Sequence, residues 1–312
     1  MPRFQYLIHL EASSYHHCDI GSGVLNNPTE TSFKIGLIGK GIQLSRTPFM
    51  HETEARRLGL TFKYDLIDTD LMGETPPPIS QILNMLEEQG YTGANITFPF
   101  KQTAMEFIDE FSDAAIGVGS VNTVLFRDGK RFGHNTDVSG FEQSYRENMM
   151  DQLKKSVLLI GAGGAGVSVA HALLKCGVGK LFVADTNHAM ADKLVSRLNP
   201  QFGDKANVIS IEAFPEISNS LDGVVNATPI GMAKLPGSPF PEGLIQQRMW
   251  IADIVYFPLE TELLKTARAI GCHTLSGAEM AVFQALHAFE LFTGISADAA
   301  AMKSSFAVFE NR

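Results

Sequence analysis

The chain has 312 residues, 45% of them hydrophobic, and 25 basic against 34 acidic residues give it a formal net charge of -9. Such a length is enough for two domains of roughly 100 to 200 residues each. The acidic balance, with no lysine- or arginine-rich run, excludes electrostatically driven binding to nucleic acid or to an anionic membrane. Because no apolar stretch approaches the roughly 20 residues of a membrane span, we expect a globular protein without either partner.

The segment 1–33 is polar and mixed, and it has no basic start followed by an apolar core, so it does not resemble a signal peptide. We describe it as an N-terminal extension whose role the sequence does not indicate. His16, His17 and Cys18 offer metal-ligating atoms, but neighbours in one loop rarely make a site without further ligands, and no metal is expected. The three cysteines lie far apart, which is typical of reduced thiols in a cytoplasmic protein.

From Phe33 onward, short apolar runs alternate with amphipathic stretches, which predicts alternating strands and helices. The expected order is strand 34–38, helix 49–58, strand 62–67, helix 80–89 and strand 94–98, a βαβαβ arrangement. Ser80 is expected to cap the start of the second helix and Gly90 its end. A strand at 121–126 then runs into Asp128-Gly129, a pair typical of a hairpin turn.

A second alternating block begins at Val157. It contains a strand, the helix 165–175, the strand 180–184 and two later apolar runs, DGVVNAT and WIADIVY. Two successive α/β units are therefore expected, with the boundary between Gly133 and Gly140.

The strongest local signal is VLLIGAGGAGVSVAHALL, in which a strand-like run enters a glycine-rich turn and a helix-forming sequence leaves it. Gly161, Gly163 and Gly166 have the spacing of the dinucleotide-binding fingerprint, in which the glycines permit a tight turn, close approach to a pyrophosphate, and packing of helix on strand. A purely structural turn is the alternative, because glycine-rich turns are common. The strand and helix on either side favour a nucleotide site.

Asp185 ends the next predicted strand, KLFVAD, close to the ~20 positions after the first glycine at which the fingerprint places an acidic residue. A carboxylate there accepts hydrogen bonds from the ribose hydroxyls of NAD and repels the 2′-phosphate of NADP. Thr186, Asn187 and His188 follow and supply no arginine for that phosphate. NAD is therefore the expected cofactor, and the alternative is that Asp185 only caps the following helix.

The first unit lacks such a fingerprint, but polar residues follow its strands. In an open α/β sheet, ligands bind beyond the carboxyl ends of strands, so these hydroxyls, an amide, a lysine and a carboxylate are expected to converge on one cleft. They suit a small polyhydroxylated acid. By spacing alone, however, the lysine is as readily a surface charge and the aspartate an ordinary turn residue. The residues are Ser45, Thr47, Thr97, Lys101, Asn122 and Asp137.

Eight segments, in chain order, resemble the shikimate dehydrogenase family, and within it they are most similar to NAD-using quinate/shikimate dehydrogenases. They are GLIGKGIQLSRTPFMHE, GANITFPFKQ, GSVNTV, GHNTDVSGF, IGAGGAG, VNATPIGM, VYFPLETELLKTARAIGC and AVFQALHAF. The resemblance extends from about Lys34 to the C-terminus and leaves 1–33 unexplained.

The resemblance implies a role for each matching residue. Lys101 and Asp137 match a catalytic pair, in which a lysine beside an aspartate accepts or relays the proton of a substrate hydroxyl. Ser45 and Thr47 match hydroxyls that receive the substrate carboxylate. The other matches are Thr97, Asn122 and Gln284 for the ring hydroxyls, Thr228, Val255 and Gly277 for the nicotinamide side, and the turn Gly161, Ala162, Gly163, Gly164, Ala165 and Gly166 for the cofactor. Without the resemblance, a glutamine in so apolar a helix would be read as a surface residue.

The fold that the resemblance implies is α/β with two domains and a cleft between them. A substrate-binding domain would comprise 34–134 and 275–312, and a Rossmann NAD-binding domain would comprise 135–274. The implied reaction is NAD-dependent oxidation of a ring hydroxyl of quinate or shikimate, giving 3-dehydroquinate or 3-dehydroshikimate. Closing of the cleft would exclude water during hydride transfer.

Three positions depart from the commoner family pattern. Thr47 stands where serine is usual, Asp185 where an arginine-bearing turn suited to NADP is usual, and Glu279 where glycine is frequent. The first two favour a quinate/shikimate dehydrogenase over the alternative of an NADP-dependent biosynthetic shikimate dehydrogenase. No physical account of Glu279 follows from the sequence.

An alternative of another class is a non-catalytic module that responds to NAD or quinate, because fold does not fix function. The presence of both Lys101 and Asp137 argues against it. The sequence does not decide between quinate and shikimate as the preferred substrate, or between a monomer and a homodimer.

Overall fold

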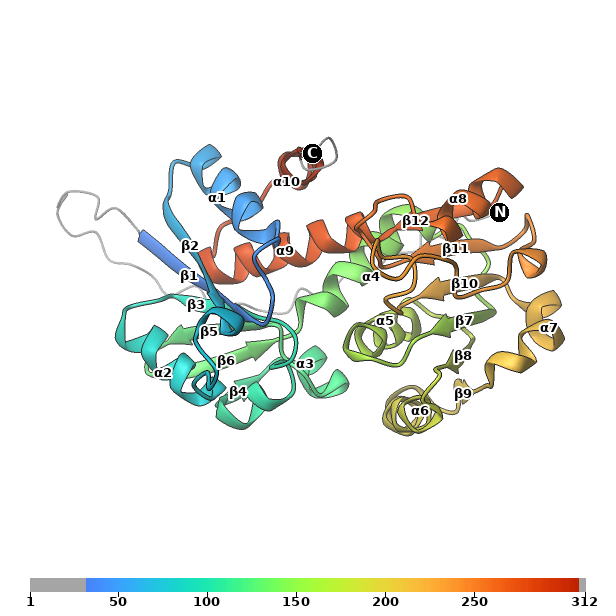
Figure 1. Ribbon diagram of the computed structural model, residues 1–312, viewed down its shortest axis with the longest axis horizontal. Coiled ribbons are helices and arrows are strands. Elements are labelled where there is room, and N and C mark those ends of the chain that lie inside the picture. Colours follow the sequence, from blue (N-terminus) through green and yellow to red (C-terminus); the bar gives the residue numbers. More distant parts are fainter. Residues whose placement is uncertain (1–31, 309–312) are drawn as a thin grey trace, which may run out of the picture. The chain divides into compact units, whose positions relative to one another are not determined.

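The computed structural model describes residues 32–308, and in this range the chain builds two six-stranded sheets with helices packed on them (Figure 1). The metal interpretation of His16, His17 and Cys18 lies outside the described residues. The α/β class expected from the alternating pattern is confirmed.

The first sheet has the strand order β2-β1-β3-β5-β6-β4. β1 pairs in parallel with β2 and β3, whereas β5 pairs antiparallel with β3 and β6. The β5–β6 hairpin turns at Asp128 and Gly129, whose φ values of 54° and 71° are those that the residue pair predicts. The strands are β1 (Ser32–Gly39), β2 (Thr61–Asp68), β3 (Gly93–Ile96), β4 (Glu110–Phe111), β5 (Thr123–Arg127) and β6 (Lys130–His134).

The second sheet is entirely parallel, with the order β12-β11-β10-β7-β8-β9. Counted from β7, this is the 3-2-1-4-5-6 order of a Rossmann domain, and the strand order reverses between β7 and β10. A ligand site is expected beyond the carboxyl ends of those two strands. The strands are β7 (Ser156–Ile160), β8 (Lys180–Ala184), β9 (Ala206–Val208), β10 (Gly223–Asn226), β11 (Trp250–Asp253) and β12 (His273–Ser276).

Two long helices, α4 and α9, pack against each other and contact both sheets: α9 contacts β1, β5 and β12, and α4 contacts β12. The helices are α1 (Thr47–Arg57), α2 (Ile79–Glu88), α3 (Asp113–Val118), α4 (Thr136–Met149), α5 (Gly164–Lys175), α6 (His188–Phe202), α7 (Phe214–Ile217), α8 (Glu262–Ile270), α9 (Gly277–Thr293) and α10 (Ala299–Ala307). Short 3-10 turns are η1 (Thr69–Leu71), η2 (Thr103–Phe107), η3 (Ile211–Ala213), η4 (Ser218–Ser220) and η5 (Glu242–Leu244).

The α4–α9 crossing depends on a glycine. A Cβ on Gly140 would lie 2.7 Å from the backbone nitrogen of Gln284, so a larger residue in α4 would push the helices apart. On its other side, α4 presents an apolar stripe at helical spacing, Val138, Phe141 and Tyr145, to the core of the second sheet. Each helix therefore takes part in a core while it packs against the other.

The start of α2 differs from the sequence expectation. Ser80 is not its N-cap: Pro78 holds that position in an extended conformation, with φ -63° and ψ 155°, and the helix begins at Ile79. Proline suits the position because it has no N–H to satisfy, and its carbonyl accepts from the amides of Gln81 and Ile82. At the other end, Gln89 is the C-cap and Gly90 follows it with φ 73°.

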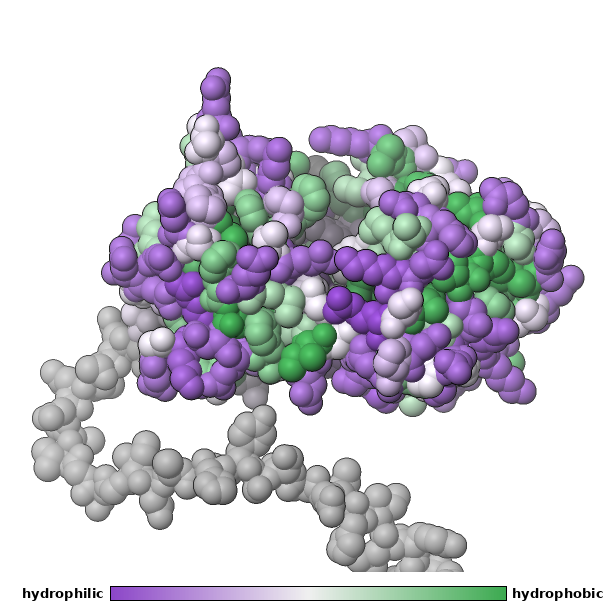
Figure 2. Space-filling view, turned by 90° about the horizontal axis from the view of Figure 1, so that it is seen from below, coloured by the Kyte–Doolittle hydropathy of each residue, from purple (hydrophilic) through white to green (hydrophobic). Residues whose placement is uncertain are grey.

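The face shown in Figure 2 is largely hydrophilic, with hydrophobic side chains in small groups. None of the helices within 32–308 is long and apolar enough to cross a bilayer. The domain bounds 34–134, 135–274 and 275–312 stay a prediction.

Candidate active site

Lys101 and Asp137 meet in an ion pair, although 36 positions separate them in the chain. Lys101 follows β3 and Asp137 lies in the first turn of α4, and the lysine Nζ is 2.5 Å from Asp137 Oδ2. Their side chains are 23% and 11% exposed. The carboxylate near the amino end of α4 is also favoured by the helix dipole. The geometry thus places a cation and an anion together at a partly accessible point.

Asn122 holds the other oxygen of that carboxylate. Its Nδ2 donates to Asp137 Oδ1 at 3.0 Å and to Thr136 Oγ1 at 2.9 Å, and its Oδ1 accepts from the backbone N–H of Thr136 at 2.7 Å. Asn122 is only 3% exposed. Both N–H groups of the Asn122 amide therefore already donate within the protein. A substrate ring hydroxyl that contacted Asn122 would donate to its Oδ1, which also accepts from the Thr136 amide.

Thr97 lies at the same edge of the first sheet. Ile38 of β1 pairs with Ile96 of β3, so Thr97 follows β3 beside the end of β1. A Cβ on Gly39 would collide with the Thr97 methyl group, which shows how closely the two strand ends pack. The half-buried Ser45 and Thr47 follow β1, and the Thr47 amide donates to Ser45 Oγ at 3.4 Å.

Gln284 of α9 packs against Gly140 of α4. Gly140 lies one turn beyond Asp137 on the same helix. Its side chain is half-buried, and its Nε2 donates to the carbonyl of Ala281 at 3.1 Å. The hydrogen bonds of the structure thus join Lys101, Asp137 and Asn122, whereas Ser45, Thr47, Thr97 and Gln284 are placed by their elements rather than by contacts with this pair.

The glycine-rich turn lies between β7 and α5, at the reversal of strand order. Gly161 has φ 105°, and a Cβ there would lie 2.7 Å from the carbonyl of Ala227 on the β10 side. A Cβ on Gly166 would collide with the Gly161 carbonyl, so this glycine lets α5 approach the turn. A Cβ on Gly163 or Gly164 would meet nothing within 4 Å. The turn therefore has a packed base and an open tip, which fits the approach of a pyrophosphate; Ala162 and Ala165 lie within it.

Asp185 connects this turn to the start of α6. Its Oδ2 accepts from the Ala162 amide at 2.7 Å, and its Oδ1 accepts from the Asn187 amide at 2.8 Å. The N-cap of α6 is Asn187 itself. Asp185 is half-buried, and each of its oxygens keeps a lone pair that a ribose hydroxyl can use. Its contacts are thus those of a residue that orders the turn beside the expected ribose.

Two of the three residues expected on the nicotinamide side, Thr228 and Val255, are linked through Asn226 and Asp253. Asn226 Oδ1 accepts from the amide and hydroxyl of Thr228, and Asp253 Oδ1 accepts from the Val255 amide and from Asn226 Nδ2. Gly277 begins α9, and a Cβ there would collide with the Ile254 carbonyl. Asn226 and Asp253, both buried, hold two of the expected nicotinamide-side residues in place, and the sequence reasoning missed them.

Two cations were also missed. A cavity of about 160 Å³ beside the glycine-rich turn is lined by Gly163, Gly164, Lys193 and Arg197, together with Gln102 after β3. Lys193 and Arg197 are one turn apart on α6, beyond the stretch 186–188 that directly follows Asp185. Their spacing on one helix face was the available signal.

Glu279 now has a physical account: Lys303 Nζ of α10 lies 2.8 Å from its Oε2, so this residue ties α9 to α10. No group of three or more histidine, cysteine, aspartate or glutamate side chains suited to a metal occurs within 32–308.

Three segments of this chain match domains of known proteins. The shikimate dehydrogenase substrate binding domain matches 37–124, the shikimate/quinate 5-dehydrogenase domain matches 145–254, and the shikimate 5′-dehydrogenase C-terminal domain matches 277–305.

Some similar proteins are named for NADP and others for NAD. A shikimate dehydrogenase (NADP(+)) of Streptomyces avermitilis is 46% identical over 280 residues, covering 89% of this chain and 96% of the relative. A quinate/shikimate dehydrogenase (NAD(+)) of Corynebacterium efficiens is 42% identical over 277 residues, covering 88% and 98%. The solved structure of quinate dehydrogenase from Corynebacterium glutamicum in complex with NAD superimposes with a TM-score of 0.86 at 42% identity, covering 89% of this chain and 99% of that one.

Proposed function

The chain belongs to the shikimate/quinate dehydrogenase family of oxidoreductases, which use a nicotinamide cofactor, and from this premise we propose that it oxidises a ring hydroxyl of quinate or shikimate with NAD. The products would be 3-dehydroquinate and 3-dehydroshikimate. The observation that carries the proposal is the contact between Lys101, which follows the carboxyl end of β3, and Asp137 in the first turn of α4.

The chemistry assigned to the pair is proton transfer. Lys101 Nζ, as the neutral amine, accepts the proton of the substrate hydroxyl, and Asp137 holds the amine in place and stabilises the charge of the ammonium group that forms. Asn122 keeps the carboxylate turned toward the lysine through its bond to Oδ1. Ser45 and Thr47 bind the substrate carboxylate, and Thr97 and Gln284 bind its hydroxyls. When bound, the nicotinamide supplies the hydride acceptor.

For the cofactor, the residues present fit a dinucleotide. The open tip at Gly163 and Gly164 admits a pyrophosphate, and Thr228, Val255 and Gly277 lie on the nicotinamide side. Asp185 supports NAD, because its carboxylate lies beside the turn and would face the 2′-phosphate of NADP with like charge. Lys193 and Arg197 favour the rival, NADP use, since both are cations that line the cavity at this turn. They line the same cavity as Gly163 and Gly164, and we assign them to the pyrophosphate.

Steady-state kinetics with each cofactor and each substrate test the proposal. We expect kcat/KM to be more than tenfold higher with NAD than with NADP, because a difference of about 1.4 kcal/mol already gives that ratio. Asp185→Ser should narrow the ratio and weaken NAD use, since it removes the repulsion together with the carboxylate contacts. Equal efficiency with both cofactors in the unmodified protein, or an unchanged ratio in Asp185→Ser, would show that Asp185 does not select the cofactor, and a higher kcat/KM with NADP would assign the protein to the NADP alternative.

The same assay separates an enzyme from a binding module. Reduced-nicotinamide absorbance should appear when the protein meets NAD and either quinate or shikimate. Binding of NAD without turnover of either substrate would favour the non-catalytic alternative and remove Lys101 and Asp137 from the mechanism.

A further inference from the structure

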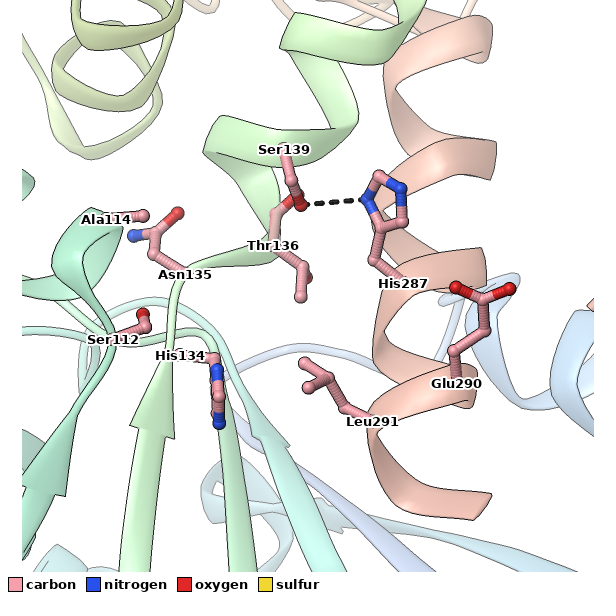
Figure 3. Close-up of a pocket in the computed structure, with 9 residues that line it drawn as sticks. All are labelled: Ser112, Ala114, His134, Asn135, Thr136, Ser139, His287, Glu290 and Leu291. Atoms are coloured by element: carbon pink, nitrogen blue, oxygen red, sulfur yellow. Dashed lines mark hydrogen bonds between the residues drawn. The ribbon is translucent and has the colours of Figure 1, made fainter. Parts of the chain in front are cut away.

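His287 of α9 makes hydrogen bonds to two residues of α4. Its Nδ1 lies 2.8 Å from Ser139 Oγ, and its Nε2 lies 2.7 Å from Gln143 Oε1. Ser139 and Gln143 are one turn apart on the same helix, so the imidazole spans a full turn of α4. Figure 3 shows the ring directed from α9 toward Ser139, at the wall of a cavity.

The surrounding hydrogen bonds determine the tautomer of this ring. Gln143 Nε2 donates to Glu147 Oε1 at 2.9 Å, and because a carboxylate only accepts, the amide oxygen of Gln143 is the atom that faces His287. That oxygen needs a donor, so the proton of the neutral ring lies on Nε2. Nδ1 is then an acceptor, and the Ser139 hydroxyl donates to it at 2.8 Å in preference to the Thr136 carbonyl, which lies farther away at 3.3 Å. Burial lowers the pKa of His287, although Glu290 and Glu142 oppose the effect, and this direction favours the neutral ring.

The two helices joined by His287 carry residues of the proposed site. Asp137 lies two positions before Ser139 on α4, and Gln284 lies one turn before His287 on α9. Between them, Gly140 packs against the Gln284 backbone. The glycine contact brings the two helices close together without a directional bond, whereas two directional hydrogen bonds to one ring hold α4 and α9 in a single register.

We propose that His287 is a positioning residue for the dehydrogenase reaction: it holds α4 in register with α9, so that Asp137 and Gln284 address the same substrate. The proposal rests on the proposed function. His287 does not touch the ion pair and acts through the helix that carries Asp137. Displacement of a reacting group by about 1 Å can cost on the order of 100-fold in rate, so a loose register is expected to lower turnover.

The cavity next to His287 makes a chemical rescue possible. It has a volume of about 400 Å³ and is lined by Ser112, His134, Asn135 and Glu290, among others. His287→Ala would extend this space by the volume of an imidazole ring and leave Ser139 and Gln143 exposed to it. Added imidazole can then bind and restore both hydrogen bonds.

We expect His287→Ala to lower kcat/KM for quinate or shikimate at least tenfold, while the Kd for NAD changes less than twofold. Imidazole should restore at least a third of the lost activity. 1-Methylimidazole keeps the acceptor nitrogen but has no N–H for Gln143, and should restore much less. His188→Ala, at an exposed histidine of α6, is the matched control and should be insensitive to both compounds. Unchanged kcat/KM, or equal rescue by both compounds, would overturn the proposal.

Two milder variants keep the test valid if His287→Ala folds poorly. Ser139→Ala and Gln143→Leu each remove one of the two contacts, and each should lower kcat/KM by a smaller factor, with no further loss when combined with His287→Ala. Long-range proton–nitrogen NMR of the unmodified protein should show the proton of His287 on Nε2, and a proton on Nδ1 would exclude the hydrogen bond from the ring to Gln143 Oε1 and with it the two-contact register. This readout needs no turnover, so it is distinct from failure of the proposed function, which would appear as inactivity of the unmodified protein with both substrates.

Discussion

The carboxylate of Asp137 is held at both oxygens, by Lys101 at one and by Asn122 at the other. This arrangement defines the direction in which the lysine can act, because Asp137 holds Nζ on one side and only the other side of the nitrogen is open to a substrate hydroxyl. It also explains why an amide is needed at position 122. An aspartate there would place a second carboxylate against Asp137, and like charges at that distance destabilise each other.

At the residue scale, the central prediction is that Lys101→Met lowers kcat by about 10² to 10⁴, the usual range for loss of general acid-base catalysis. Methionine keeps most of the side-chain volume and removes the amine, so the Kd for NAD should stay within twofold. Lys130→Met, which removes an exposed lysine from the β5–β6 hairpin, is the control and should retain full activity. Turnover within threefold of the unmodified protein would exclude Lys101 from proton transfer.

At the element scale, the sequence predicts those features that depend on local residue preferences. The hairpin at Asp128-Gly129 and the strand, turn and helix around Gly161 lie where the pattern places them, because positive φ and the βα turn are properties of adjacent residues. The predicted start of α2 was wrong: the helix begins at Ile79, one residue before the expected start, and its N-cap is Pro78 instead of Ser80. Serine and proline are both favoured near the start of a helix, so residue preference alone does not choose between them.

Contacts between residues that are far apart in the chain cannot be predicted from local residue preferences. Residue preference marks Asn226 and Asp253 only as polar positions at strand ends, and their mutual hydrogen bond of 2.9 Å exists because β10 and β11 are neighbours. The Asp185–Ala162 contact likewise requires β8 to lie beside β7. The roles expected of Ser45, Thr47, Thr97 and Gln284 stay predictions, because they concern a substrate rather than the chain.

A buried polar link between elements gives a second prediction. Ser168 of α5 donates to Asn135 Oδ1 at 3.3 Å, and Asn135 in turn caps α4 and donates to the carbonyl and hydroxyl of Ser120 at 3.1 Å. Ser168→Ala should lower the free energy of unfolding by about 1 kcal/mol, the usual net value of one hydrogen bond.

The chain offers a matched control for this variant. Ser144 on α4 is as fully buried as Ser168, but its hydroxyl has no hydrogen-bond partner among the described residues. Ser144→Ala should therefore leave the free energy of unfolding unchanged or raise it, because it removes an unsatisfied polar group. Urea unfolding of both variants decides the matter, and equal destabilisation would show that the Ser168 contact contributes nothing of its own.

At the scale of the whole molecule, α4 and α9 join the two sheets through separate cores. α4 contributes Phe141 and Tyr145 to the core of the second sheet, and α9 contributes Ala288 and Phe292 to the core over the first. Unfolding of either core removes one side of the helix pair. We therefore expect the described part of the chain to lose its structure as one cooperative unit. The free energy of unfolding then depends on both sheets, and a measurement of global unfolding reports the contribution of a buried group in either of them.

Asp253 is such a group. It is 1% exposed at the end of β11, and burial raises its pKa to about 6, although hydrogen bonds from Thr261, Val255 and Asn226 oppose the rise. The folded protein therefore holds this proton more tightly than the unfolded chain, whose value is 3.8. As the pH rises from below 4 to above 6, the contribution of Asp253 to the free energy of unfolding falls, and it is constant above that window.

Asp253→Asn isolates this contribution, because asparagine keeps the oxygen that accepts from Val255 and Asn226 and cannot ionise. Since one pKa unit corresponds to about 1.4 kcal/mol, the stability of the unmodified protein relative to the variant should fall by roughly 2 to 3 kcal/mol between pH 4 and pH 7. Carboxylates whose pKa is lowered, such as Glu142, change stability in the opposite direction but are common to both proteins and cancel in the difference. Urea unfolding at half-unit pH intervals measures it. Parallel curves for the two proteins would mean that Asp253 is ionised in the folded state as readily as in the unfolded chain, and that its hydrogen bonds from Thr261, Val255 and Asn226 fully offset the cost of burial.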